Sequence, residues 1–245
     1  MDFRKDQQRY RRSKPSMLGR GIERLTNPVG GALASLVPRK LVEGVVKGID
    51  RAVGAPKFVT FAHDPQDMEA ARDAARKVER VARSVNAGTG AASGFGGALT
   101  MSADVPATIA IAMRNIRDTG RAYGFDGEGP QERLFRLQIL ELAALNDQDV
   151  RQERIAALEA AIADDGSLTA LKGKAIEPLV DQAVERISRA LAFASVRGRA
   201  GMVVPIVGAA VGAFVNNSFQ SDVSKAARFA FQARRLKAAG TGSDG

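Results

Sequence analysis

The sequence predicts an all-α protein, a single compact helical bundle, and three observations support this fold class. Apolar residues recur at spacings of three and four along most of the 245 residues. No segment alternates apolar and polar residues for long enough to form a convincing strand. Aromatic residues make up only 5% of the chain. The core therefore has to be built from Ala, Val, Ile and Leu, which suits closely packed helices.

The first two helices are expected before residue 90. An apolar stripe predicts a helix from Arg39 to Gly54. The next helix has a clear start, with Asp64 as its N-cap and Pro65 at the first helical position. Its apolar residues continue at helical spacing to about Asn86.

Five further helices complete the expected order. Gly124 is expected to end the third helix, and the run 164–166 (Asp-Asp-Gly) reads as a turn that ends the fifth. The expected helices are Val105–Tyr123, one opened by Pro130, Asp147–Ala163, about Ala175–Val196, and Asp222–Ala239.

Two long stretches carry no charge and are rich in glycine. They are 84–103, with 20 residues, and 200–221, with 22. A helix that is apolar all round is buried either in protein or in lipid. Both interpretations stay open: a central helix pair of the bundle, or two segments that open and insert into one leaflet. Glycines spaced four apart would let the two backbones approach closely: Gly90, Gly94, Gly208 and Gly212.

Most catalytic and metal-binding patterns are missing from the sequence. The chain has no Cys, which excludes disulfides, zinc ribbons and thiol nucleophiles. Its one histidine, His63, reads as a surface-loop residue just before a helix. No P-loop occurs, and the glycines at 94, 96 and 97 do not follow a strand, so they are no dinucleotide fingerprint. We therefore expect no cofactor, no metal and no catalytic residue set.

Positive charge is concentrated at the two ends of the chain. The formal net charge is +9, and residues 1–57 carry 13 Lys and Arg against 5 Asp and Glu. We expect a basic, mostly disordered tail at 1–36, a helical domain at 37–239 and a flexible end at 240–245. Basic ends on a near-neutral body are typical of contacts with polyanions. The expected contacts to an anionic surface are Arg4, Lys5, Arg9, Arg11, Arg12, Lys14, Arg234, Arg235 and Lys237.

The N-terminal region lacks the pattern of a secretory signal. A signal peptide needs an apolar run soon after its basic start, and charged residues interrupt every candidate here. The uncharged stretches are marginal for a membrane span, which needs about 20 predominantly apolar residues. We therefore expect a cytoplasmic protein that is peripheral to the inner face of the membrane.

Polar residues near 104–126 raise the question of a buried polar site. Asp104 can cap the following helix. Arg114 either pairs with Asp118, four residues on, or points at Asp104 or a main-chain carbonyl inside the bundle. Because Asp104, Arg114, Tyr123 and Asp126 flank or lie on a mostly apolar helix, we expect them to be largely buried.

Two ordered motifs resemble the signatures of the EcsC family of bacterial proteins. The first is the run 104–126, in which the matching residues are Asp104, Pro106, Arg114, Tyr123, Gly124 and Asp126. The second is the run 203–236, which resembles the family's Pro-x-x-Gly-x-x-x-Gly helix through Pro205, Gly208, Gly212 and the following Asn216. The family is named for a protein encoded beside an ABC transporter linked to secretion. The resemblance implies a helical fold and a link to the membrane, and it brings no catalytic residues.

Charge, motifs and exclusions together favour a non-enzymatic helical protein at the membrane surface. Its expected partner is the anionic membrane surface or a membrane transport component. With the second partner, the protein would act as an accessory to ABC-transporter-linked transport or secretion. The first alternative is non-specific nucleic-acid binding through the same basic ends. The second alternative is an enzyme with a carboxylate site near Asp104 and Asp126.

Overall fold

The computed structural model describes residues 3–13, 37, 39–93, 101–145, 147–171, 175–200 and 205–240. For 88–93, 101–104, 192–200 and 205–217 it describes the backbone alone. Over these ranges the protein is all helical, as predicted, and its only strand-like pairing is a single bridge between Ile162 and Leu168. The helices are α1 (Phe3–Arg12), α3 (Arg39–Val53), α4 (Met68–Ser93), α5 (Met101–Ala122), α6 (Pro130–Ala144), α7 (Gln148–Ala160), α8 (Ile176–Ala200) and α9 (Pro205–Gly240).

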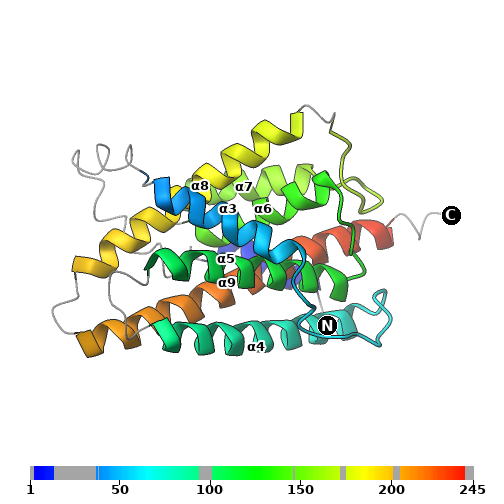
Figure 1. Ribbon diagram of the computed structural model, residues 1–245. Coiled ribbons are helices and arrows are strands. Elements are labelled where there is room, and N and C mark those ends of the chain that lie inside the picture. Colours follow the sequence, from blue (N-terminus) through cyan, green and yellow to red (C-terminus); the bar gives the residue numbers. More distant parts are fainter. Residues whose placement is uncertain are drawn as a thin grey trace.

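Helix α9 is the long central element of the bundle. It packs against α1, α4, α5, α6, α7 and α8. In Figure 1 it runs beside α4 along the lower side, while α3, α6, α7 and α8 lie above α5. Helix α4 runs antiparallel to α5 and α9, which run parallel to each other. The core lies between α5, α6 and α9 and is filled by large apolar side chains: Ile109, Ile116, Leu137, Leu140, Phe219 and Phe231.

Several helix ends agree with the local sequence signals. The Asp147 side chain accepts hydrogen bonds from the backbone N–H groups of Asp149 and Val150, at 2.9 and 3.0 Å, and so caps α7. Pro130 opens α6 as predicted. Gly124 and Gly166 have φ angles of +81° and +77°, in the left-handed region that favours glycine. These two glycines end α5 and form the turn after α7.

Other boundaries differ from the sequence prediction. The helix expected to start at Pro65 begins at Met68, because the residues from Asp64 to Asp67 form a turn and Asp67 accepts from the N–H groups of Glu69 and Ala70. Asp104 does not cap α5, since the helix already starts at Met101. The segment from 205 and the helix expected from Asp222 form one continuous 36-residue helix, α9.

The first helix corrects the expectation of a disordered N-terminal tail. Residues 3–12 form α1, which docks on α9. The Gln7 side chain donates to the Phe229 carbonyl at 3.1 Å, and the Tyr10 ring stacks on the Phe229 ring with 4.5 Å between centroids. Arg151 of α7 donates to the Tyr10 carbonyl at 2.9 Å. The contacts that order this basic segment are therefore made with residues distant in the sequence. Residues 14–36 and 241–245 lie outside the described residues.

The close helix contacts that the structure describes involve a different glycine pair from the predicted one. A Cβ on Gly48 of α3 would lie 2.6 Å from Ile109 Cβ, so α3 and α5 approach closely there, with Gly44 one turn earlier against Val105. The predicted contact between Gly90, Gly94, Gly208 and Gly212 falls outside the described residues and side chains, and it stays a prediction.

Candidate functional site

The signature arginine of α5 has a structural partner. Arg114 donates to the Pro56 carbonyl from Nε at 3.1 Å and from Nη2 at 2.7 Å, and its guanidinium lies 4.0 Å from the centroid of the Phe58 ring. It therefore meets a main-chain carbonyl, but Arg114 is only half-buried, whereas the sequence predicted it to be largely buried inside the bundle. Partial burial lowers the pKa of Arg114, and the nearby Asp118 charge opposes that shift.

Asp118 pairs with a neighbour that the sequence analysis did not select. Its carboxylate contacts Arg117 Nε at 3.2 Å and accepts from the Phe58 N–H at 2.5 Å. Arg117 also donates to the carbonyl of Ala52, in the last turn of α3, and to that of Ala55, just beyond the helix. Asp118 thus forms a buried pair with Arg117 and not with Arg114, the alternative that the sequence also left open. These contacts fix the chain between α3 and α4 against α5.

The end of α5 combines one correct and one incorrect expectation. The Tyr123 side chain is fully buried, and its hydroxyl accepts from Gln232 Nε2 of α9 at 3.1 Å. Burial raises the pKa of Tyr123 to about 12. Asp126, which was expected to be buried, is exposed, because the chain has already left the helix at Gly124. Pro106 is buried inside α5. The side chains of Asp104 and Asn216 lie outside those described.

Of the basic residues at the end of α9 that were predicted to contact an anionic surface, Arg234 is buried, which corrects that prediction, while Arg235 and Lys237 are partly exposed. Arg234 is 3% exposed; it pairs with Glu132 of α6 at 2.9 Å and donates to the Gly166 carbonyl at 3.0 Å. Arg235 donates to the Tyr123 carbonyl, and Lys237 donates to the Ile162 carbonyl. These three cations join α9 to the end of α5, to α6 and to the turn after α7.

The N-terminal cations remain at the surface. Arg4, Lys5, Arg9, Arg11 and Arg12 are exposed on α1. Arg9 contacts Asp6 at 3.4 Å and Arg11 contacts Glu159 of α7 at 2.6 Å. Lys14 lies outside the described residues. Part of the predicted anionic-surface contact is therefore presented to solvent, on a docked helix.

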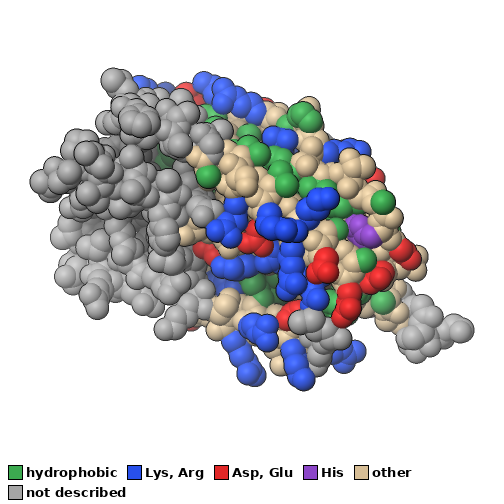
Figure 2. Space-filling view, turned by 90° about the horizontal axis from the view of Figure 1, so that it is seen from below, with side chains coloured by type: hydrophobic (Ala, Val, Ile, Leu, Met, Phe, Trp, Pro, Cys, Tyr) green, Lys and Arg blue, Asp and Glu red, His purple; other side chains and the backbone are tan. Residues whose placement is uncertain are grey.

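A basic row on α4 was missed by the sequence analysis. Arg76, Lys77, Arg80 and Arg83 are all exposed. Seen from the α4 side, Figure 2 shows a band of Lys and Arg side chains across the middle of the described surface, while Asp and Glu gather mainly toward one end. The sequence does contain a pattern that indicates this row, because the cations at positions 76, 80 and 83 are spaced four and three residues apart, as on one face of a helix. Because the segment 58–222 is near neutral overall, its average charge concealed this local row.

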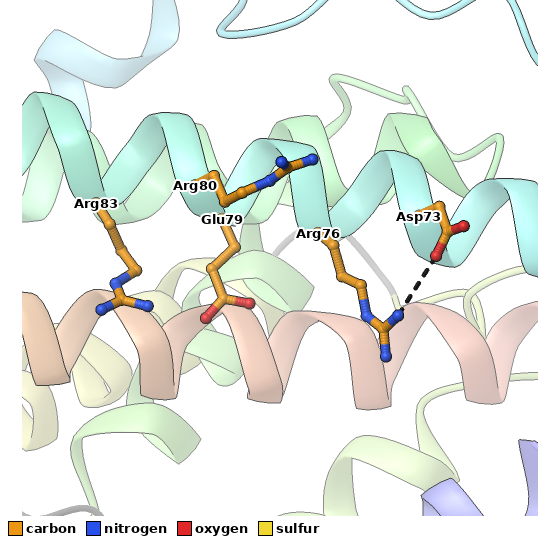
Figure 3. Close-up of a pocket in the computed structure, with 5 residues that line it drawn as sticks. All are labelled: Asp73, Arg76, Glu79, Arg80 and Arg83. Carbon is orange, nitrogen blue, oxygen red and sulfur yellow. Dashed lines mark hydrogen bonds and ion pairs between the residues drawn. The ribbon is translucent and has the colours of Figure 1, made fainter.

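A shallow hollow on the same face is lined by three arginines and two carboxylates. Asp73, Arg76, Glu79, Arg80 and Arg83 line it. In Figure 3 the side chains of Arg76, Glu79 and Arg83 extend from α4 toward α9, whereas Arg80 lies along α4. The Glu79 carboxylate binds Arg228 at 2.5 Å and accepts from the Ser221 hydroxyl at 3.1 Å, both on α9. Glu79 is thus held by α9, and the arginines dominate the rest of the hollow.

The described residues show no cluster of side chains suited to metal binding. Within them, no group of three or more His, Asp and Glu side chains could hold a metal ion. The His63 ring contacts the Ala122 carbonyl through Nε2 at 2.8 Å and the Phe61 ring edge-on, which anchors the segment before α4. In the same part of the chain, no helix is long and apolar enough to cross a membrane.

Fold and site together define a class of protein: an all-helical bundle whose candidate site is an exposed basic face. Comparison with known proteins identifies it further. The chain matches the EcsC protein family over residues 4–236 and belongs to that family. The match covers α1 as well as the rest of the bundle.

Two proteins of Bacillus subtilis (strain 168) are similar to this chain. Protein EcsC is 26% identical over 228 residues, which cover 91% of this chain and 89% of that protein. The uncharacterized protein YdbA is 26% identical over 149 residues, which cover 60% of this chain and 51% of that protein. No solved structure matches this chain.

Proposed function

We propose that this protein is a non-enzymatic, peripheral membrane protein that docks on the anionic inner face of the cytoplasmic membrane. The observation that carries the proposal is the exposed basic row of α4: Arg76, Lys77, Arg80 and Arg83. The exposed cations of α1 add further positive charge to the surface of the protein. Each Lys or Arg near an anionic leaflet contributes about 1 kcal/mol of binding free energy, so a row of four is sufficient for reversible docking.

We extend this proposal to a role as an accessory to ABC-transporter-linked secretion. It is supported by membership of the EcsC family. The curated relative that covers most of this chain carries the name Protein EcsC. A surface-docked helical bundle is a form suited to contact with a membrane transport component.

Flotation with vesicles of graded phosphatidylglycerol content tests the docking. The Lys77→Gln/Arg80→Gln variant removes two cations from the α4 row. The matched control, Lys47→Gln/Arg51→Gln, removes the same two residue types from exposed positions on α3. We expect the α4 variant to lose about 30-fold in vesicle affinity, the equivalent of about 2 kcal/mol, while the α3 variant keeps most of its binding.

Two results would contradict the proposal. The first is equal binding by the α3 and α4 variants, because it would show that net charge alone decides binding. The second is a lack of flotation combined with DNA binding that falls steeply with salt, which would favour the nucleic-acid alternative. Circular dichroism spectra of all variants should match that of the parent protein, since the substituted side chains are exposed.

Insertion of the uncharged stretches 84–103 and 200–221 would add to electrostatic docking. An environment-sensitive dye on Ser218→Cys, near the polar end of the second stretch, reports on it, because the chain has no native cysteine. We expect a blue shift with anionic vesicles and none with DNA. An unchanged spectrum on vesicles that float the protein would restrict the contact to the surface.

A further inference from the structure

An open groove with an apolar floor lies between α3 and α8. Its volume is about 310 Å³, and the residues of the floor come from both helices: Val42, Val46, Ile49, Val180 and Val184. The two helices contact each other and cross in Figure 1, so their side chains separate on either side of the crossing. In the same view, α4 with its basic row lies on the other side of α5.

The valines of this groove reach the surface because α3 turns its glycines toward α5. Gly44 and Gly48 allow α3 and α5 to approach closely, as described above. The side of α3 that carries the valines faces α8 instead, and there Val46 is 40% exposed while Val42 and Val180 are half-buried. Water therefore reaches apolar surface on both sides of the groove, and covering that surface with an apolar ligand is favourable.

The charged side chains that line the groove leave one negative charge unmatched. They are Arg133 of α6 and the two carboxylates Asp181 and Glu185 of α8. Arg133 contacts Asp50 at 3.6 Å, and Glu185 contacts Arg189 at 2.5 Å. Asp181 is exposed and forms no ion pair with any residue that the structure describes. The charge that remains for a ligand is therefore the Asp181 carboxylate, which selects a cation.

The size and the lining of the groove suit a small amphipathic molecule. Small-molecule sites typically measure about 300–1,000 Å³ and combine a mostly apolar surface with a few polar groups that orient the ligand. From Val42 to Ile49 the floor follows two turns of α3, a length of about 10 Å, which suits an octyl chain. We propose that the groove binds a primary amine with an apolar chain, whose ammonium group faces Asp181. This inference is independent of membrane docking, since it involves neither α1 nor α4.

Methyl NMR spectra of the full-length protein test the site with octylammonium, kept below the concentration at which it forms micelles. We expect saturable shifts of the valine signals of the floor. The methyl signals of Val53, which is 66% exposed on α3 and does not line the groove, should stay unchanged. Octanol should bind about threefold more weakly, because it lacks the charge for an exposed ion pair with Asp181. Octanoate, with the opposite charge, should bind more weakly still.

The decisive variant is Asp181→Asn, which keeps the shape of the side chain and removes its charge. It should bind octylammonium and octanol equally, with the same floor valines shifted. Glu153→Gln on α7 is the matched control, because it removes one carboxylate from another exposed position, and it should keep the full preference for octylammonium. Both substituted side chains are exposed, so the spectra without ligand should match that of the parent protein outside the substituted position.

Three results would overturn this inference, and none of them affects membrane docking. Shifts that miss the floor valines, or a spectrum that octylammonium leaves unchanged, would show that the groove is not the site. Equal binding of octylammonium, octanol and octanoate by the parent protein would show that no cation is selected. A preference that Glu153→Gln loses as fully as Asp181→Asn would assign the selectivity to net charge and not to Asp181.

Discussion

Arginine side chains in this protein fall into two groups that differ in burial. Arg117 and Arg234 are 7% and 3% exposed, and each donates to main-chain carbonyls and to a carboxylate. Arg76, Arg80 and Arg83 lie on the surface of α4. A buried guanidinium without partners would be strongly unfavourable, so the first group is committed to the fold. The second group is exposed to solvent.

At Gly48 the backbones of α3 and α5 leave no room for a side chain. A Cβ there would lie 2.6 Å from Ile109 Cβ and 2.8 Å from the Pro106 carbonyl oxygen. We expect Gly48→Ala to destabilise the protein by about 1–3 kcal/mol through overpacking, despite the better helix propensity of alanine. Urea denaturation measures the effect. The control Gly54→Ala, where a Cβ would meet nothing within 4 Å, should change stability by less than about 0.5 kcal/mol.

The two tyrosines predict a loss of stability at high pH. Burial raises the pKa of both Tyr10 and Tyr123 to about 12, against an ordinary value of 10.0. Above pH 10 the unfolded chain loses these protons and the folded chain keeps them, so deprotonation favours unfolding. Each tyrosine should lower stability by up to about 1.4 kcal/mol per pH unit between pH 10 and 12.

Denaturation curves at pH 8 and pH 11 measure this tyrosine effect. Tyr123→Phe should show a smaller loss between the two pH values than the parent protein. The tyrosine absorbance of the folded protein should also titrate at a higher pH than that of the denatured chain. Since the sequence has only 2 Tyr and no Trp, the signal is easily assigned. Coincident titrations of the folded and denatured chains would contradict the prediction.

At the scale of elements, one buried carboxylate joins three helices. Glu141 of α6 is 2% exposed; Arg186 of α8 contacts it at 2.6 Å and Arg154 of α7 at 3.5 Å. Both arginines are partly exposed, whereas the carboxylate is not. The arrangement therefore positions α7 and α8 on α6, and the free energy of the cluster depends on keeping Glu141 paired.

Removing the closer partner should expose that dependence. We expect Arg186→Ala to destabilise the protein by about 3 kcal/mol, because Glu141 stays buried with only the longer contact to Arg154. Adding Glu141→Leu to Arg186→Ala should recover part of the loss, since the uncompensated charge is gone. A double-mutant cycle by chemical denaturation measures both effects. Strictly additive losses would show that the pair is not coupled.

At the scale of the whole molecule, the second half of α9 holds the bundle together. Its buried residues face α1, α4, α5 and α6, and they include Ala226, Ala227, Phe229, Ala230 and Phe231. These side chains lie in the core between α4, α5 and α6. A bundle without them would have a large unfilled interior, which close-packed proteins do not tolerate.

Truncation tests this dependence directly. A chain that ends at Val223 should lose its cooperative thermal transition, because the core partners of α5 and α6 are removed. A chain that ends at Gly240 should melt as the parent protein does, since α9 is then complete. Scanning calorimetry of both truncated chains decides the matter, and a cooperative transition in the shorter one would contradict the central role of α9.

The sequence by itself determined the all-helical fold class, the family resemblance and several helix ends. Asp147, Pro130, Gly124 and Gly166 act where the local pattern placed them, because caps and left-handed turns depend on residues within a few positions of each other. The apolar spacing of three and four is local in the same sense. Even the basic row at 76, 80 and 83 could have been found by examining helix faces in place of segment averages.

Only the tertiary structure decided which cations bind groups within the fold. Arg234, Arg235 and Lys237 resemble surface charges in the sequence, yet they bind groups between 68 and 112 positions away in the chain. The basic N-terminal segment is a docked helix because Gln7 meets the Phe229 carbonyl 222 positions later. Whether a charged side chain faces water or a distant carbonyl depends on how the helices pack, and packing joins residues that no local pattern relates.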